Sequence, residues 1–425
     1  MRSLQRRLGT ADAVALGLGA MLGTGVFTAL GPAAGAAGRW LLLSLLLAAV
    51  VATCNALSSA DLAAVHPQAG GSYVYAGVRI GPWSARLAGS AFLVGKTASA
   101  AAAAGAFGVY VVPAAPTVAA VALVAAMTAI NTVGVRWTAR VTWVLVTVVL
   151  LVLALVVVAG LLTDAAARPA GAALVAVDPA ANPAGDPPPS PAGVLAGAGL
   201  LFFAFAGYAR MATLGEEVRD PARSLRRAIP LALAIALVVY LLVAIAALRA
   251  LGPEVLASAT APLADVVAAS TFADLTAVVR IGAAVATMSV LLSVLVGVSR
   301  TTLAMARGGD LPAALTTIGR RGTPWRADLA GGAVAAVLAV LAGPAAAIAL
   351  SAGCVLVYYA VTNAAAMRLR PHERRWPRWT SYLGFFLCLL LAFTLQVLTT
   401  ALVLGVAVCV VALIARRRGG NVPEL

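Results

Sequence analysis

Two apolar stretches of the chain are interrupted by glycines near their middle. One is residues 17–27, where Gly23, Thr24 and Gly25 follow one another, and the other is residues 201–211, with Gly207 at its centre and Arg210 three residues later. Backbone that leaves a helix inside a bilayer keeps unpaired N–H and C=O groups, which are tolerated only where protein buries them or where they line a cavity. Helix packing explains one such glycine by itself. Two matching interruptions favour a ligand site between them.

The first interruption suits a carboxylate group. A helix that starts near Gly25 has free N–H groups and the positive end of the helix dipole at its beginning. We therefore assign a ligand carboxylate to the amides of Thr24 and Gly25 and to the Thr24 hydroxyl, with Gly23 at the turn. Glycine at position 25 also lets a ligand approach the backbone closely.

The ends of the interrupted helices suit an ammonium group. A helix C-terminus leaves carbonyl oxygens without a helical partner, and the candidates are the carbonyls of Met21, Phe203 and Ala206. The aromatic rings of the second stretch could cover a bound ligand, although ordinary packing explains the ring at position 205 equally well. This stretch adds four further residues to the predicted site: Ala204, Phe205, Gly207 and Tyr208.

Two cations fall inside apolar segments. Lys96 is the only lysine of the chain and lies near the middle of the run 84–111. A lysine buried without a counter-ion can gain and lose a proton, so Lys96 is a candidate for proton coupling or for holding the core together in its charged form. Snorkelling to the membrane surface is the alternative. Arg210 is the second candidate. Its partner is Glu216 or Glu217, or else an acidic ligand; we expect the pair, because Glu217 lies two turns on, roughly on the same helix face.

Membrane helices are needed to position these residues. Of the 425 residues, 62% are hydrophobic and 11% are charged, whereas soluble domains carry about 25% charged residues. Apolar runs of about 20 residues can cross a bilayer. We therefore predict an all-α integral membrane protein, a single domain over residues 1–425 with twelve spans. Their expected bounds are 11–31, 41–63, 84–111, 115–133, 141–162, 193–214, 229–250, 276–303, 328–343, 345–367, 381–397 and 399–415.

The distribution of basic residues predicts the orientation. If the spans alternate, 24 of the 30 Lys and Arg residues fall on the side of the N-terminus, and four fall on the other: Arg39, Arg168, Arg249 and Arg280. Cytoplasmic loops carry such an excess, so we expect both termini in the cytoplasm and the protein in the cytoplasmic membrane. The net charge of +15 then reflects topology rather than a nucleic-acid surface. The longer outer loops, 164–192 and 251–275, are interpreted as solvated connectors.

Five motifs, in order along residues 9–370, resemble the amino acid–polyamine–organocation (APC) superfamily of permeases, and within it bacterial relatives of cationic amino acid transporters. They are residues 23–27 (GTGVF), 70–75 (GGSYVY), 203–208 with 216–221 (FAFAGY and EEVRDP), 300–312 (ending MARGGDLP) and 358–363 (YYAVTN). The resemblance implies a LeuT-like fold with two inverted five-helix repeats, 11–162 and 193–367, and two additional helices in 381–415. It also implies secondary active transport by alternating access, with the first and sixth helices unwound around a substrate amino acid.

The coupling ion is a separate question. Some relatives carry a lysine in the fifth helix, whereas Val149 stands at about that position here. We expect proton-coupled symport, with Lys96 or Arg210 as the proton carrier. A sodium site would instead use carbonyl and hydroxyl groups of the first and eighth spans, for which Ser289, Ser293 or Ser299 are available.

The substrate class is indicated only indirectly. Small residues around Ser99 in the third span leave room for a sizeable side chain, and no acidic residue is placed to select a cationic one, which favours neutral substrates. An amino acid or amine exchanger, or a polyamine carrier, would use the same fold. A polyamine has no carboxylate for the helix start at Gly25.

Other classes of function fit less well. A membrane enzyme would need a polar constellation inside the spans, but His66 and His372 fall in loops, and no metal or cofactor set is apparent. A sensor would bring a soluble output domain. The chain also has no Walker motif for ATP-driven pumping.

Overall fold

The computed structural model describes residues 9–66, 70–134, 139–163, 190–208, 211, 218, 220–395 and 397–417, and its elements are α-helices and short 3-10 helices. The first half contains α1 (Thr10–Met21), α2 (Thr24–Thr28), α3 (Leu30–Ala37), η1 (Gly38–Trp40), α4 (Leu41–Val65), α5 (Ser72–Arg79), α6 (Pro82–Val111), α7 (Pro116–Val133) and α8 (Ala139–Leu161). The second half contains α9 (Pro191–Phe205), η4 (Ala206–Tyr208), α11 (Pro221–Ser258), α12 (Pro262–Ala268), η5 (Ala273–Leu275), α13 (Thr276–Arg307), η6 (Ala313–Thr316), α14 (Trp325–Leu341), α15 (Pro344–Met367), η7 (Pro371–Glu373), α16 (Arg378–Thr394) and α17 (Val397–Arg417).

Ten helical segments of the described chain are long and apolar enough to cross a membrane. Two further helices, α14 and α16, have 17 residues each and stand where the sequence predicts spans 328–343 and 381–397. A span needs about 20 apolar residues, and these two helices are shorter than that. The protein is an all-helical membrane protein, and the number of twelve spans stays a prediction.

Local sequence signals determine where several of these helices begin. Proline stands in the first turn of α6, α7, α9 and α15, where its missing N–H is not needed and its φ angle already suits a helix. Ser190 caps α9, because its hydroxyl accepts a hydrogen bond of 3.0 Å from the Gly193 N–H. From this start α9 runs for 15 residues to Phe205, where the second interruption begins.

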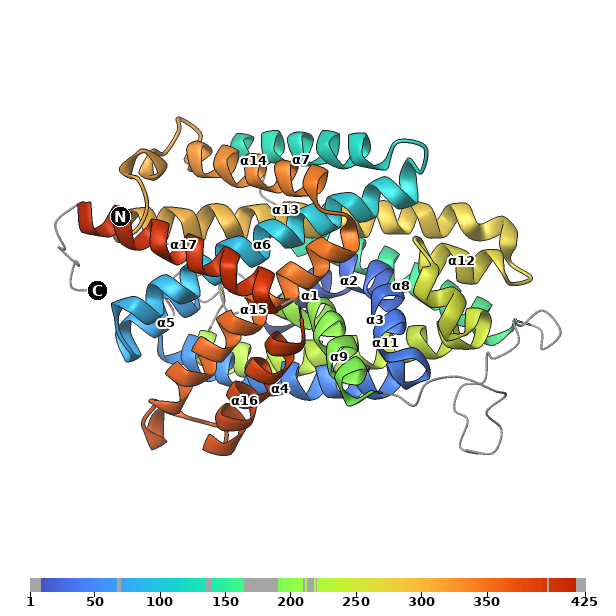
Figure 1. Cartoon of the computed structure of the whole chain (residues 1–425), viewed down its shortest axis with the longest axis horizontal. Coiled ribbons are helices and arrows are strands. Elements are labelled where there is room, and N and C mark those ends of the chain that lie inside the picture. The colour runs from blue at the N-terminus through green and yellow to red at the C-terminus, as the bar shows by residue number, and fades with distance from the viewer. Residues whose placement is uncertain are drawn as a thin grey trace.

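The interrupted helices lie in the middle of the bundle. Figure 1 shows α1, α2 and α9 near its centre, with α7 and α14 along one edge and α4 and α16 along the opposite edge. Helix α6 packs against α13 and α15, and α4 packs against α9 and α11. Small side chains allow these close contacts, since the run from Ala100 to Ala104 on α6 is buried throughout.

The segment 251–275 differs from the solvated connector that the sequence suggested. The backbone leaves the helix at Gly252, whose φ is +71°, and the short helix α12 buries Leu263, Val266 and Val267. The Leu263 N–H donates to the Tyr110 hydroxyl at 3.2 Å, and that hydroxyl donates to the Phe27 carbonyl at 2.8 Å. Helix α12 therefore packs over the end of α2. The sequence did not indicate this helix, because its apolar residues are interspersed with Pro, Gly and acidic residues. Residues 164–189 of the other predicted connector lie outside the described residues.

A network of charged side chains joins several helices at one end of the bundle. The Arg79 guanidinium donates to both carboxylate oxygens of Glu373, at 2.7 and 3.1 Å, and its Nε donates to His66 Nε2 at 2.9 Å. The Arg370 N–H donates to the same carboxylate at 2.7 Å. These hydrogen bonds lower the pKa of Glu373 to about 2, with those from Arg79 contributing more than the one from Arg370. Burial, and then the charge of Arg79, lowers the pKa of His66.

The stability of this end is expected to depend on pH. Because the pKa of Glu373 falls from 4.5 to about 2 on folding, its ionised form stabilises the fold above about pH 4.5, and this contribution is lost as the pH drops toward 2. The unfolding temperature of Glu373→Gln should lie below that of the wild type at pH 7, and the gap should narrow below pH 4.5. Thermal unfolding in detergent between pH 7 and pH 3 measures it. The exposed Glu254→Gln is the control, and a gap that persists unchanged to pH 3 would contradict the prediction.

Candidate functional site

The first predicted interruption is present in the backbone. Helix α1 ends at Met21 and α2 begins at Thr24, with Leu22 and Gly23 outside helical geometry between them. Gly23 has no side chain to cap α2, so the first-turn N–H groups have no side-chain acceptor there. The buried Thr24 hydroxyl has no hydrogen-bond partner among the described residues. This end of α2 therefore presents a buried hydroxyl that a ligand oxygen can satisfy.

The second interruption follows the end of α9. The helix stops at Phe205 and continues as one 3-10 turn, Ala206–Tyr208. A 3-10 turn changes the hydrogen-bond partners of the backbone and often marks a functional position. Arg210, together with its predicted partners Glu216 and Glu217, lies outside the described residues.

The glycines of the two interruptions face each other's backbones. A Cβ atom at Gly25 would overlap the Cα atom of Ala204, and one at Gly207 would overlap the carbonyl group of Ala20. A Cβ atom at Gly23 would overlap the side chain of Val290 on α13. The missing side chains therefore serve close packing between the broken helices. This packing is a second reason for glycine at position 25, besides the approach of a ligand that the sequence suggested.

Tyr240 on α11 joins the two interruptions. Its hydroxyl lies 2.6 Å from the Met21 carbonyl oxygen and 2.9 Å from the Ala204 carbonyl oxygen, and its single proton is shared between them. The ring is buried and packs edge-on against Phe205, with centroids 4.9 Å apart. The end of α1 and the last turn of α9 are thus held at one point. Sequence reasoning missed Tyr240, because a tyrosine in an apolar helix carries no mark of which carbonyl it reaches.

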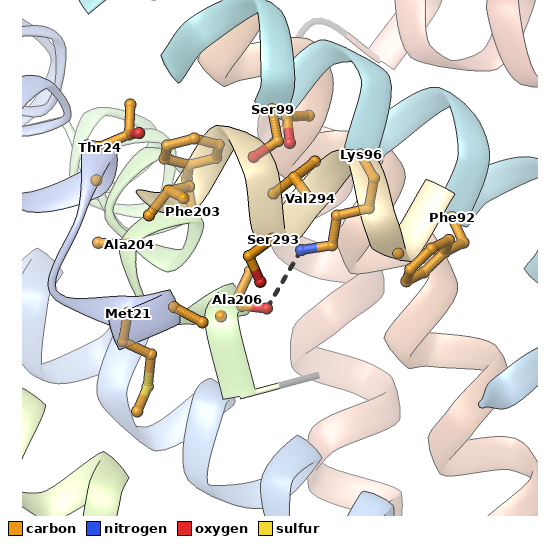
Figure 2. A pocket seen from close by; sticks show the side chains of 16 residues that line it. Met21, Thr24, Phe92, Lys96, Ser99, Phe203, Ala204, Ala206, Ser293 and Val294 are labelled. Carbon is orange, nitrogen blue, oxygen red and sulfur yellow. Dashed lines mark hydrogen bonds between the residues drawn. The ribbon is translucent and has the colours of Figure 1, made fainter. Parts of the chain in front are cut away.

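A cavity of about 680 Å³, including its opening, lies between the two interruptions (Figure 2). Its wall contains ten of the predicted residues: Met21, Thr24, Gly25, Lys96, Ser99, Phe203, Ala204, Ala206, Gly207 and Ser293. Gly23 and Ser289 are not part of this wall. The rings of Phe205 and Tyr208 are also directed elsewhere, packing on Tyr240 and on Tyr359, with 5.0 Å between the centroids of the latter pair. These two rings therefore belong to the helix contacts, because each has an aromatic partner on another helix.

Helical spacing would have identified several lining residues that were missed. On α6, Phe92 precedes Lys96 by four residues and Ser99 follows it by three, and all three line the cavity. On α13 the lining residues are spaced by three and four: Val290, Ser293, Val294 and Gly297. This spacing places residues on one face of a helix. The α13 stripe was not recognised because nearly every position of that helix is apolar or small.

Lys96 points into the cavity. Lys96 is 9% exposed, and its ammonium group donates a hydrogen bond of 3.3 Å to the Ala206 carbonyl. Figure 2 shows the ammonium beside Ala206 and Ser293. The described residues that form the wall include no Asp or Glu. The charge therefore meets a carbonyl dipole rather than a counter-ion there.

The three carbonyls predicted to receive an ammonium group already accept hydrogen bonds from the protein. Met21 accepts from both Tyr240 and the Gly23 N–H, Ala206 accepts from Lys96, and Phe203 accepts from the Ala206 N–H. A carbonyl oxygen has two lone pairs and can accept a second hydrogen bond. Both lone pairs of the Met21 oxygen are therefore engaged within the protein, whereas a ligand ammonium group would share the Ala206 oxygen with Lys96. The sequence could not reveal the Tyr240 and Lys96 donors, because these two residues lie on other helices.

A cavity between two interrupted membrane helices is typical of membrane carriers, whose sites are built from such discontinuous helices. The sequence pattern of the amino acid permease family matches residues 12–422. The chain belongs to the amino acid permease family, within the APC superfamily.

Individual relatives agree with this family. An uncharacterised transporter of Mycobacterium tuberculosis is 52% identical over 95% of this chain and 90% of the relative. The branched-chain amino acid permease BcaP of Bacillus subtilis is 27% identical over 80% of this chain and 76% of the relative. A vacuolar cationic amino acid transporter of Arabidopsis thaliana is 28% identical over 79% of this chain and 55% of the relative. The family is one of transporters and not of enzymes.

Proposed function

We propose that this protein is a secondary active transporter that carries an amino acid across the cytoplasmic membrane by alternating access. The observation that supports it best is the cavity between α1, α2 and α9, where the Thr24 hydroxyl is buried without a partner among the described residues. Membership of the amino acid permease family supports the same class of substrate.

The proposed architecture follows the sequence prediction. Two inverted five-helix repeats, 11–162 and 193–367, are followed by two helices in 381–415, and both termini lie in the cytoplasm. The two interrupted helices, α1 with α2 and α9 with η4, are the first members of these repeats, and matching interruptions are typical of inverted-repeat transporters. The short helices α14 and α16 would serve as the ninth and eleventh spans.

The substrate is proposed to bind through the groups that all amino acids share. Its carboxylate would accept hydrogen bonds from the Thr24 hydroxyl and from the amides of Thr24 and Gly25. Its ammonium group would use the second lone pair of the Ala206 carbonyl, because Tyr240 and the Gly23 N–H already engage both lone pairs of the Met21 carbonyl. Figure 2 supports this arrangement, since Thr24 lies on one side of the cavity and Ala206 lies below it in that view.

Proton coupling is proposed to pass through Lys96. Among the described residues that line the cavity, Lys96 is the one with an ionisable side chain. Its hydrogen bond to the Ala206 carbonyl connects it to the second interruption. Val149 of α8, at the position where some relatives carry a lysine, is apolar and buried. The alternative, a sodium ion, would use Ser293, which lines the cavity, whereas Ser289 does not.

Uptake into proteoliposomes tests the function. The purified chain is supplied with a panel of labelled amino acids under an imposed proton gradient, an imposed sodium gradient, or neither. We expect accumulation of at least one amino acid under the proton gradient. Uptake that requires amino acid inside the vesicle would show an exchanger instead. Transport of no amino acid under any of these conditions would refute the proposal.

Replacing Lys96 is expected to uncouple transport from protons. In Lys96→Met the proton carrier is lost, so the proton gradient should no longer drive accumulation, and accumulation should fall about tenfold or more. Exchange without a gradient should persist, because the ligand groups at Thr24 and Gly25 remain. The control is Arg39→Met, which removes a cation that is not part of the cavity wall. Full proton-driven accumulation in Lys96→Met would exclude this role.

A further inference from the structure

The relatives leave the side chain of the substrate open. Their names include a branched-chain amino acid permease and cationic amino acid transporters. The cavity itself carries a distinguishing feature, the Lys96 ammonium. We propose that Lys96 is a charge filter, so that the cavity takes amino acids whose side chain carries no positive charge. This inference rests on the proposed function and adds the class of substrate to it.

The first support is the charge of the wall. Lys96 is the single ionisable side chain among the described residues that line the cavity. The buried acids of the described core are engaged elsewhere: Asp61 pairs with Arg226 at 3.4 Å, Asp310 pairs with Arg86 at 2.9 Å, and Asp328 accepts a hydrogen bond from Asn131 at 2.7 Å. A cationic ligand would therefore meet one positive charge and no described negative charge in the wall.

The second support is the position of Lys96 relative to the bound ligand. With the carboxylate at Thr24 and the ammonium group at Ala206, the side chain leaves toward the remaining wall. That part of the wall contains Val294 and Phe92, and Lys96 lies between them in Figure 2. A substrate side chain directed there contacts apolar groups and the ammonium of Lys96. Leucine-like chains suit such a surface, whereas an ornithine or lysine chain brings a second cation to it.

The third support is the size of the repulsion between the Lys96 ammonium and a cationic substrate side chain. Two like charges about 6 Å apart, at an effective dielectric constant of about 20, weaken binding by about a hundredfold. Lys96 has limited freedom to withdraw, because it is 9% exposed and is held by the Ala206 carbonyl. A filter that retains half of this repulsion energy still separates cationic from neutral amino acids by about tenfold.

Pairs of amino acids that match in size isolate the charge. Ornithine has the chain length of norleucine, and 2,4-diaminobutyrate has that of norvaline, so each pair differs by an ammonium in place of a methyl group. Proteoliposomes that contain the full chain are preloaded with unlabelled norvaline, and uptake of each external compound, supplied in ¹³C-labelled form, is measured by mass spectrometry as exchange. Exchange needs no proton gradient, so variants with impaired coupling can be compared.

The expected result is a large preference for the neutral member of each pair. In the wild type, norleucine and norvaline should be taken up at least tenfold faster than their cationic partners. Lys96→Met should reduce the preference to threefold or less, and Lys96→Glu should reverse it. Arg39→Met, which removes a cation that is not part of the cavity wall, should keep the wild-type preference.

Three results would overturn the filter. Equal uptake within each pair by the wild type excludes it directly, and so does a tenfold preference that persists in Lys96→Met. If both Lys96 variants are inactive, the thermal stabilisation of the wild type by each compound replaces uptake, and equal stabilisation within each pair overturns the filter. Equal uptake leaves the proposed function intact, whereas uptake of none of the four compounds, together with an inactive amino acid panel, removes both proposals.

Discussion

Gly25→Ala is expected to abolish transport and to destabilise the protein. The added methyl group would overlap the Cα atom of Ala204, which is backbone and cannot rotate away. Helices α2 and α9 would have to separate at the place where the cavity is built, so we expect at least a tenfold loss of transport. Overpacking of this kind costs about 1–3 kcal/mol of unfolding free energy. Uptake and thermal unfolding in detergent measure the two effects.

A glycine elsewhere provides the matched control. A methyl group added at Gly405 on α17 would have no atom within 4 Å, so Gly405→Ala should leave transport and unfolding temperature at wild-type values. Gly207→Ala should behave like Gly25→Ala, because its Cβ atom would overlap the carbonyl group of Ala20. Wild-type transport by Gly25→Ala would mean that the close contact between α2 and α9 is not needed.

Tyr240→Phe is the second change with a large expected effect. It removes the hydroxyl that serves the Met21 and Ala204 carbonyls but keeps the ring that packs on Phe205. The Met21 carbonyl keeps the Gly23 N–H as a donor at 2.8 Å, so the change removes a shared buried hydrogen bond, which costs about 0.5–1.5 kcal/mol. Because about 1.4 kcal/mol corresponds to a factor of ten, we expect up to about a tenfold loss of transport along with the lower stability. The same uptake and unfolding assays apply.

The control for Tyr240 is a tyrosine on the outer surface of the bundle. Tyr382 is 55% exposed, so Tyr382→Phe should change neither transport nor unfolding temperature. If Tyr240→Phe transports at the wild-type rate, the contact between Tyr240 and the two interruptions is dispensable for the cycle. If it loses stability but not transport, the hydroxyl has a structural role alone.

Much of the scaffold could be predicted because its signals are local. Glycines at positions 23 and 25 marked the end of α1, since glycine weakens a helix at the residue where it stands. Apolar runs predicted most of the spans within a few residues of the observed helices. The buried helix α12 was missed, because its apolar residues are scattered among turn-forming ones.

The candidate site was predicted in outline and differs in detail. The sequence indicated Thr24, Lys96 and Ala206, and all three line the cavity. It also proposed Phe205 and Tyr208, whose rings pack on other helices instead. Whether a ring on an apolar helix faces a ligand or another helix depends on the rotation of that helix. A uniformly apolar sequence does not reveal this rotation, because it has no polar face.

By itself, the sequence determined that this chain is a helical membrane protein with two glycine-interrupted helices and one lysine among apolar residues. The tertiary structure alone decided what those features contact. Gly25 faces Ala204, the carbonyls of Met21 and Ala204 face Tyr240, and Lys96 reaches the Ala206 carbonyl across 110 positions of the chain. The physical reason is that backbone preference belongs to each residue, whereas the partner of a buried polar group is set by how distant helices pack.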